Sequence, residues 1–314
     1  MHVFVTGATG FAGSYLVKHL ISLGHCVFGT TYPQKPEDCD RAEGACIEHL
    51  DLNNSAAVDH CIQEAKPERI FHLAAVSNVR HSWENRRETL ETNIIGTFNL
   101  MEAVRRFAPS SRMLFVSSSD VYGKISGRKR ALSEDDSTRI MSPYAFTKLS
   151  GELMMDFYGQ IEKLDVVTAR PFPHTGPGQS PDFVCSDWAY QVACIEIKKT
   201  EPVIQVGNID ISRDFSDVRD VVKAYALLLE HGRRNELYNI SSGKAISLRQ
   251  ILDSLLSFSS IPIQIKMDRS RLRKADISEL WGDNSKIKKE TSWKPEIPLK
   301  QTLMDLLNYW RDQV

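Results

Sequence analysis

The amino-acid sequence predicts an α/β protein in which a doubly wound parallel sheet is followed by a smaller, mixed α/β lobe. In the first half, short apolar runs without alternation are separated by longer amphipathic segments, as in strands covered by helices on both faces. A glycine-rich turn, "TGATGFAG", joins the first such strand to the first helix. After "DVVTARP" the pattern changes to a stretch rich in Pro and Gly. Together these features indicate a Rossmann-type nucleotide-binding architecture with a smaller C-terminal lobe.

The elements of the first half follow in a regular order. Short apolar segments predict strands at 2–7, 26–31, 47–52, 69–75, 112–119 and 165–171. Amphipathic segments predict helices at 12–24, 55–66, 88–107 and 144–163, the first ended by Gly24. Each helix therefore connects two strands of the expected parallel sheet.

The second half is expected to be less regular. Residues 172–182 are too rich in Pro and Gly for regular structure, and a helix at 184–199 and a strand at 203–208 follow. A helix at 217–231 is expected to return to the main sheet, and a mixed lobe over 243–297 precedes a final helix at 299–314. That lobe carries a helix at 246–258 and a strand at 263–268. We expect an NAD(P)-binding domain of residues 1–170 plus about 210–240, and a substrate lobe of 171–209 and 241–314.

Composition narrows the function classes. The 314 residues are 42% hydrophobic and 25% charged with a formal net charge of -1, which gives no electrostatic reason to expect nucleic acid or an anionic membrane as a partner. No apolar run approaches the roughly 20 residues of a membrane span. The six cysteines form no C-x-x-C pair, which favours free thiols in a reducing cytoplasm, and no metal site is predicted.

The glycines of "TGATGFAG" predict a phosphate cradle. Gly7, Gly10 and Gly13 stand between a strand and a helix, where glycine permits a tight turn and a close approach to pyrophosphate. The amides at the start of the helix, with the helix dipole behind them, hold phosphates.

The end of the second strand bears on the choice of dinucleotide. An acidic residue there would bind the adenosine ribose and favour NAD, but the strand ends in Thr30, Thr31 and Tyr32. NADP(H) is therefore favoured and NAD(H) remains possible, since the nearest cations are only Lys35 and Arg41. Asp51 follows the third strand and can reach the adenine, and small residues from "HLAA" leave room for the cofactor at the end of the fourth strand.

The segment "MSPYAFTK" places a phenol and an ammonium one helical turn apart. Ser142 can cap the helix and Pro143 suits its first turn, so Tyr144 and Lys148 lie on one face. A free phenol ionises near pH 10, and a nearby cation favours phenolate, so Tyr144 is expected to exchange a proton near neutrality. Ser118, at the end of a buried strand, would hold the reacting oxygen. Alone, Y-x-x-x-K is a common surface pair, but the glycine cradle and the serine strand point to an active site.

These motifs, in this order, resemble those of the extended short-chain dehydrogenase/reductase family: "TGATGFAG", "HLAA", "SSSDVYG" and "SPYAFTK". In the C-terminal half, "ARPFPHTGPGQ", "VGNIDISRDFSDVRDVVKAY", "LYNISSG" and "SWKPEIPLKQTLMDLLNYWR" resemble the GDP-4-keto-6-deoxy-mannose reductases, relatives of GDP-mannose 4,6-dehydratase. The resemblance implies hydride transfer between nicotinamide and carbon 4 of a nucleotide-linked sugar. It assigns catalysis to Ser118, Tyr144 and Lys148.

The resemblance also assigns binding residues. Those implied for the cofactor are Gly7, Gly10, Phe11, Ala12, Gly13, Thr31, Tyr32, Asp51, Leu52, Leu73, Ala74, Ala75, Tyr144, Lys148, Pro171 and His174. Those implied for the substrate are Ser77, Ser118, Pro173, Val184, Arg213, Arg273 and Asp276. The arginines suit phosphate because their planar fork bonds two oxygens at once.

Three positions depart from the family's usual pattern. Dehydratases usually carry a glutamate where this chain has Asp120, and a carboxylate about 1 Å short of its proton weakens the dehydratase reading. Pro173 replaces a usual asparagine that contacts substrate, and Lys274 stands where a proline usually follows the arginine. The sugar therefore stays open.

Three functions remain in competition at this stage. An NAD(P)H-dependent reductase of a GDP-4-keto-6-deoxy-hexose comes first, and a dehydratase or epimerase with recycled dinucleotide comes second. A non-catalytic dinucleotide sensor is the third. The two long helices at 88–107 and 144–163 carry surplus apolar positions, and relatives pair these helices, so we expect a homodimer.

Overall fold

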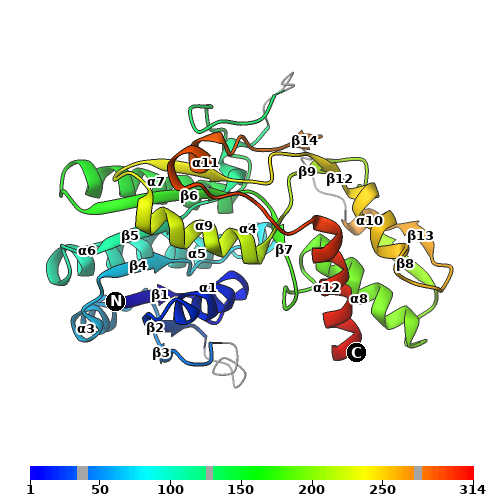
Figure 1. Cartoon of the computed structure of the whole chain (residues 1–314), viewed down its shortest axis with the longest axis horizontal. Helices are drawn as coiled ribbons and strands as arrows, with labels where there is room; N and C mark the ends of the chain where they lie inside the picture. Colours follow the sequence, from blue (N-terminus) through cyan, green and yellow to red (C-terminus); the bar gives the residue numbers. More distant parts are fainter. Residues whose placement is uncertain (34–41, 125–129, 272–277) are drawn as a thin grey trace.

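A seven-stranded parallel sheet forms the centre of the computed structural model, which describes residues 1–33, 42–124, 130–271 and 278–314 (Figure 1). Its strand order is β11-β6-β5-β4-β1-β2-β3. The strands are β1 (His2–Thr6), β2 (Cys26–Thr31), β3 (Cys46–His49), β4 (Arg69–His72), β5 (Arg112–Val116), β6 (Asp165–Pro171) and β11 (Leu237–Ile240). The chain order reverses between β4 and β1, so a ligand crevice is expected at the carboxyl ends of these strands. The predicted Rossmann-type doubly wound fold is confirmed.

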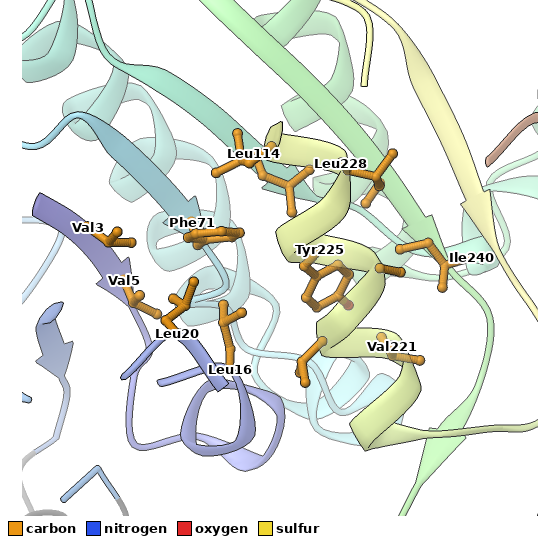
Figure 2. Close-up of a cluster of buried hydrophobic side chains, with 14 of the residues drawn as sticks. Val3, Val5, Leu16, Leu20, Phe71, Leu114, Val221, Tyr225, Leu228 and Ile240 are labelled. Atoms are coloured by element: carbon orange, nitrogen blue, oxygen red, sulfur yellow. The ribbon is translucent and has the colours of Figure 1, made fainter. Parts of the chain in front are cut away.

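Helices cover both faces of this sheet. One face carries α1 (Phe11–Ser22), α9 (Val218–His231) and α11 (Ser285–Thr291), and the other carries α3 (Ser55–Ala65), α6 (Gly96–Phe107) and α7 (Pro143–Gln160). Figure 2 shows the first of these layers, where Tyr225 and Leu228 of α9 approach Phe71 and Leu114 of the sheet. Because both faces are buried, the strands lack polar alternation.

The helix expected at 88–107 is divided. It consists of α5 (Arg86–Leu90), a π-helical turn η1 (Glu91–Ile95) and α6, and a short helix, α4 (Val79–Glu84), precedes it. Within η1 the Asn93 side chain pairs with the backbone of Val76 and donates to the Thr147 hydroxyl at 2.9 Å. The π-turn thus coincides with hydrogen bonds to residues outside the helix. The spacing of apolar residues in the sequence does not predict such bonds.

A second group of elements lies beside the sheet (Figure 1). Helices α8 (Val184–Glu196), α10 (Leu248–Leu256) and α12 (Leu299–Gln313) share an apolar core with the parallel pair β8 (Val203–Val206) and β13 (Gln264–Met267). The three-stranded sheet contains β9 (Ser212–Arg213), β12 (Ile246–Ser247) and β14 (Glu279–Leu280). The remaining short elements are β7 (His174–Thr175), β10 (Ser216–Asp217), η2 (Ser119–Tyr122) and η3 (Arg269–Arg271). The expectation of no regular structure in 172–182 is wrong at β7, because β10 pairs with it.

Two further observations bear on the sequence-based expectations. No helix of the described ranges is both long and apolar enough to cross a bilayer. The described cysteines are free thiols, namely Cys26, Cys46, Cys61, Cys185 and Cys194, and Cys39 lies outside the described residues.

Candidate active site

A glycine cradle lies between β1 and α1. Gly7 has a φ of +69°, in the left-handed region that glycine adopts without strain. A Cβ at Gly7 would lie 2.9 Å from the Ala74 nitrogen, and one at Gly13 would lie 2.9 Å from the Gly7 carbonyl carbon. These close approaches leave room for no side chain, and they bring the amides at the start of α1 to the carboxyl edge of the sheet. The cradle fits the pyrophosphate of a dinucleotide, with half-buried Phe11 and Ala12 in the first helical turn.

The ends of β2 and β3 lie side by side at this edge. Thr31 is buried, and its hydroxyl lies 2.7 Å from that of Thr9. Tyr32 is 58% exposed, and its ring centroid lies 5.2 Å from that of His49, which pairs in register with Thr31. His49 was not expected at this edge, because the sequence alone does not show that β3 ends beside Tyr32. The cations considered above, Lys35 and Arg41, lie outside the described residues.

Asp51 and Leu52 follow β3. The Asp51 carboxylate accepts a hydrogen bond from the Asn53 amide at 2.9 Å, so it shapes the turn before α3. Leu52 is buried, and a Cβ at Gly96 would lie 2.8 Å from its Cβ. Both residues stand at the carboxyl edge of the sheet.

The segment Leu73 to Ala75 follows β4, where the Ala74 amide donates to the Thr6 hydroxyl at 3.1 Å. The preceding residue, His72, is fully buried, with its two ring nitrogens 2.7 Å from the Thr6 hydroxyl and 2.9 Å from that of Thr97. Burial lowers the pKa of His72 to about 3, so the imidazole is neutral. His72 therefore fixes the end of β4 next to the cradle.

Tyr144, Lys148 and Ser118 come together at the carboxyl ends of β4, β5 and β6. Ser142 caps α7 by accepting from the Ala145 amide at 3.0 Å, which confirms the predicted helix start. The Lys148 ammonium donates to the Val116 carbonyl at 2.8 Å and lies 5.9 Å from the Tyr144 ring centroid. Ser118 caps η2, and its hydroxyl accepts from the Asp120 amide at 3.2 Å.

Burial controls the acidity of this site. It raises the pKa of the Tyr144 phenol, and the Asp120 carboxylate raises it further, whereas a hydrogen bond with Ser118 lowers it. The expectation that Tyr144 exchanges a proton near neutrality is therefore wrong for the protein chain alone, because burial disfavours the phenolate. Burial also lowers the pKa of Lys148 to about 8, although Glu152 acts in the opposite direction. At neutral pH the phenol is thus protonated.

His174 lies on the side of the cradle that faces the second group of elements. Its Nδ1 donates to the Phe172 carbonyl at 3.1 Å, and its ring stacks on that of Phe11 with centroids 6.1 Å apart. Burial lowers the pKa of His174. The Pro173 carbonyl accepts from the Ser216 amide at 3.0 Å, so this proline belongs to the β7–β10 pairing, and Pro171 is buried at the end of β6.

The other residues expected to bind substrate are more widely spread. Ser77 is exposed after β4, Val184 is the first residue of α8, and Arg213 is half-buried in β9 with its guanidinium donating to the Ser212 carbonyl at 2.7 Å. Arg273, Lys274 and Asp276 lie outside the described residues.

The chain is similar to known enzymes over almost its whole length. The family model described as GDP-mannose 4,6 dehydratase matches residues 4–306. The GDP-6-deoxy-D-mannose reductase of Pseudomonas aeruginosa is 33% identical over 313 residues, which cover 99% of this chain and 98% of the relative. Human GDP-mannose 4,6 dehydratase is 25% identical, covering 97% of this chain and 90% of the relative.

Solved structures agree with these sequence relatives. The structure of RMD from Pseudomonas aeruginosa complexed with NADPH has a TM-score of 0.86 and 31% identity and covers 99% of each chain. The Thermus thermophilus UDP-glucose 4-epimerase complex with NAD has a TM-score of 0.89 and 26% identity and covers 100% of each chain. The protein belongs to the GDP-mannose 4,6 dehydratase family, within the NAD(P)-dependent enzymes of the extended short-chain dehydrogenase/reductase class.

Proposed function

We propose that this protein is an NADPH-dependent reductase of a nucleotide-linked 4-keto-6-deoxy-hexose, with GDP-4-keto-6-deoxy-mannose as the favoured substrate. The observation that carries the proposal is the convergence of Ser118, Tyr144 and Lys148 beside a glycine cradle, at the carboxyl edge of the sheet. The 33% identity to a GDP-6-deoxy-D-mannose reductase supports the choice of reaction and of nucleotide.

The chemistry divides between cofactor and protein. Reduced nicotinamide, when bound, supplies a hydride to carbon 4 of the sugar. Tyr144 donates a proton to the carbonyl oxygen as that oxygen becomes an alkoxide. Because its pKa is raised, the phenol is protonated at neutral pH, which is the form that this step needs. The Ser118 hydroxyl donates to the same oxygen and orients the ketone. Lys148, held by the Val116 carbonyl, supplies a charged donor for the nicotinamide ribose.

The cofactor preference follows from the end of β2. Thr31 and Tyr32 occupy the positions where a carboxylate would repel a 2′-phosphate, and the similar Pseudomonas aeruginosa structure was solved with NADPH. NAD(H) is the alternative, as in the similar epimerase structure. Competitive titration with NADPH and NADH, followed by the fluorescence of the reduced nicotinamide, measures the preference directly.

A second candidate function is a nucleotide-sugar 4,6-dehydratase or epimerase that recycles its dinucleotide, because both kinds of enzyme are among the relatives. Asp120 argues against the dehydratase, since the aspartate carboxylate is one methylene shorter than the family's glutamate. The experiment that separates the two functions incubates the protein with GDP-, dTDP-, UDP- and CDP-linked sugars and either reduced dinucleotide. Stoichiometric loss of reduced nicotinamide supports the reductase, whereas product without loss supports recycling.

A sensor that binds dinucleotide without turnover is the third candidate. The variant Tyr144→Phe tests it, because phenylalanine keeps the ring and removes the proton donor. For an enzyme, turnover should fall by about 10²–10⁴-fold while NADPH binding is retained. A sensor's output would be unchanged by this substitution.

We also propose that two copies of the chain pair through α6 and α7. Exposed apolar side chains gather on these helices and at their ends, with Ile95 49%, Phe98 46%, Leu153 65%, Phe157 50% and Ile161 66% exposed. Such a patch is unusual on a monomer surface and fits a self-complementary interface. Leu153→Glu should halve the mass measured by light scattering, whereas Leu23→Glu, at an exposed leucine after α1, should leave it unchanged. A wild-type mass of one chain refutes the pairing.

A further inference from the structure

A buried ion pair joins α7 to β6 directly beneath the proposed catalytic residues. The Glu152 carboxylate accepts from Arg170 twice, with distances of 2.7 Å to Nε and 2.6 Å to Nη2. Their side chains are only 8% and 7% exposed. Glu152 stands one helical turn beyond Lys148 and two turns beyond Tyr144, so all three lie along one side of α7.

The pair contacts the segments that carry the other catalytic groups. Ser117, which precedes Ser118, donates its hydroxyl to the Glu152 carboxylate at 2.5 Å. The Arg170 guanidinium lies 4.8 Å from the ring centroid of Tyr122, the last residue of the η2 turn that Ser118 caps. The two charged side chains thus connect α7, the end of β5, η2 and β6 at one point.

Stability alone gives little reason for charge at this position. Moving two charges out of water costs more than their attraction returns in many proteins, and well-packed apolar residues of similar volume often replace such a pair without loss. Within the described residues, the Arg170 Nη1 is buried and has no hydrogen-bond partner, so the pair is not fully compensated. Its contacts with Ser117 and Tyr122 lie on both sides of Ser118 in the sequence.

We propose that Glu152 and Arg170 form a positioning pair that holds the Ser118 hydroxyl in register with Tyr144 and Lys148. This inference rests on the proposed reductase function. Glu152 accepts a hydrogen bond from the Ser117 hydroxyl, next to Ser118, and is the carboxylate that favours the charged form of Lys148. Neither Glu152 nor Arg170 is required to touch substrate or dinucleotide.

The ionisable groups on the elements packed around Lys148 differ in their effect on its pKa. On α7 these are Tyr144 and Glu152, on β4 the neutral His72, in η2 Asp120, and on β6 Arg170. Among these, Glu152 is the carboxylate that raises the pKa of Lys148 against the effect of burial. Removing it should therefore move the lysine titration to lower pH.

The test replaces both charges at once, because a single substitution would leave one charge buried and could unfold the protein. Glu152→Leu with Arg170→Met fills the site with apolar side chains. The matched control is Glu196→Leu with Arg311→Met, which removes another two-fold hydrogen-bonded pair, between α8 and α12. Thermal unfolding and NADPH fluorescence titration establish first that both double variants fold and bind dinucleotide.

The positioning role predicts that the double substitution changes kcat much more than KM. With NADPH and GDP-4-keto-6-deoxy-mannose, kcat of the Glu152/Arg170 double variant should fall about 10²-fold with KM nearly unchanged, since the serine hydroxyl is misplaced by a fraction of an ångström to 1 Å. The alkaline limb of its rate profile should also move to lower pH. The control variant should keep the wild-type kcat and pH profile.

A folded Glu152/Arg170 double variant with wild-type kcat and an unmoved alkaline limb would overturn the proposal. If the wild-type protein reduces no sugar nucleotide, the proposed function fails separately, and NMR titration of Lys148 with 13C-labelled lysine still tests the pair. A titration midpoint that moves to lower pH in the double variant then supports it, and an unmoved midpoint refutes it.

Discussion

Substituting Gly13 by alanine is the sharpest test of the phosphate cradle. The added Cβ would collide with the Gly7 carbonyl oxygen and lie 2.9 Å from its carbon and 3.0 Å from the Ala8 carbonyl carbon. Carbon atoms in ordinary contact are about 3.5–4.0 Å apart, so the start of α1 must move away from the turn by roughly 0.5–1 Å. These neighbours are backbone atoms, so no side chain can rotate to relieve the contact.

That displacement moves the amides that would hold the pyrophosphate. A shift on the order of 1 Å can cost about 10²-fold where geometry is demanding, so the dissociation constant for NADPH should rise by about that factor. The assay is a fluorescence titration of NADPH at fixed salt, because screening alters phosphate binding. Overpacking also costs about 1–3 kcal/mol of stability, so circular dichroism must show that the variant is folded at the assay temperature.

Gly24→Ala is the matched control at the other end of α1. Gly24 has a φ of +79° but its Cβ would meet nothing within 4 Å, so the substitution introduces backbone strain of about 1–2 kcal/mol without a collision. It should lower the melting temperature and leave NADPH affinity unchanged. If folded Gly13→Ala binds NADPH with wild-type affinity, the close packing of α1 on the Gly7 turn does not serve the cofactor, and the assignment of the cradle is wrong.

Three further predictions concern pH, cofactor choice and substrate. Because burial lowers the pKa of Lys148 to about 8, its charged form is lost as pH rises through that value, and kcat/KM with NADPH should fall above about pH 8; a level rate well above it contradicts a role for the ammonium. Thr31→Asp places a carboxylate where a 2′-phosphate is expected, so the ratio of NADPH to NADH affinity should fall at least about tenfold; an unchanged ratio argues against this site. Arg213→Ala should raise KM for the GDP-sugar by about 10–100-fold at nearly constant kcat, and a change only in the KM of NADPH would refute the substrate role.

The fold was largely predictable from the sequence because local pattern and tertiary structure agree. Buried parallel strands are apolar along their whole length, and the helices between them are amphipathic, so β1 to β6 and the helices α1, α3 and α7 were found with small errors at their ends. The exceptions depend on distant partners. β7 exists through its pairing with β10, and η1 contains Asn93, which bonds Val76 and Thr147.

For the proposed site residues, the sequence predicted their placement in the fold better than their electrostatics. Helix capping and spacing place Tyr144 and Lys148 on one face of α7, and the ends of parallel strands meet at one edge of the sheet. Spacing carries no information about burial, and burial reverses the expected direction of the Tyr144 pKa shift. The Glu152–Arg170 pair was likewise hidden, because an arginine inside an apolar strand and a glutamate on a helix reveal their contact only in three dimensions.

The direction of the Tyr144 pKa shift is consistent with the proposed reduction of a sugar ketone. Removing a proton from a sugar hydroxyl requires phenolate, which burial and the Asp120 carboxylate both disfavour at Tyr144. Donating a proton to a developing alkoxide requires only neutral phenol, because an alkoxide is by far the stronger base. The positive charge of an oxidised nicotinamide would favour phenolate, whereas reduced nicotinamide is neutral and leaves the phenol protonated. The raised pKa of Tyr144 therefore agrees with the proposed reductase, as does the shorter carboxylate at position 120.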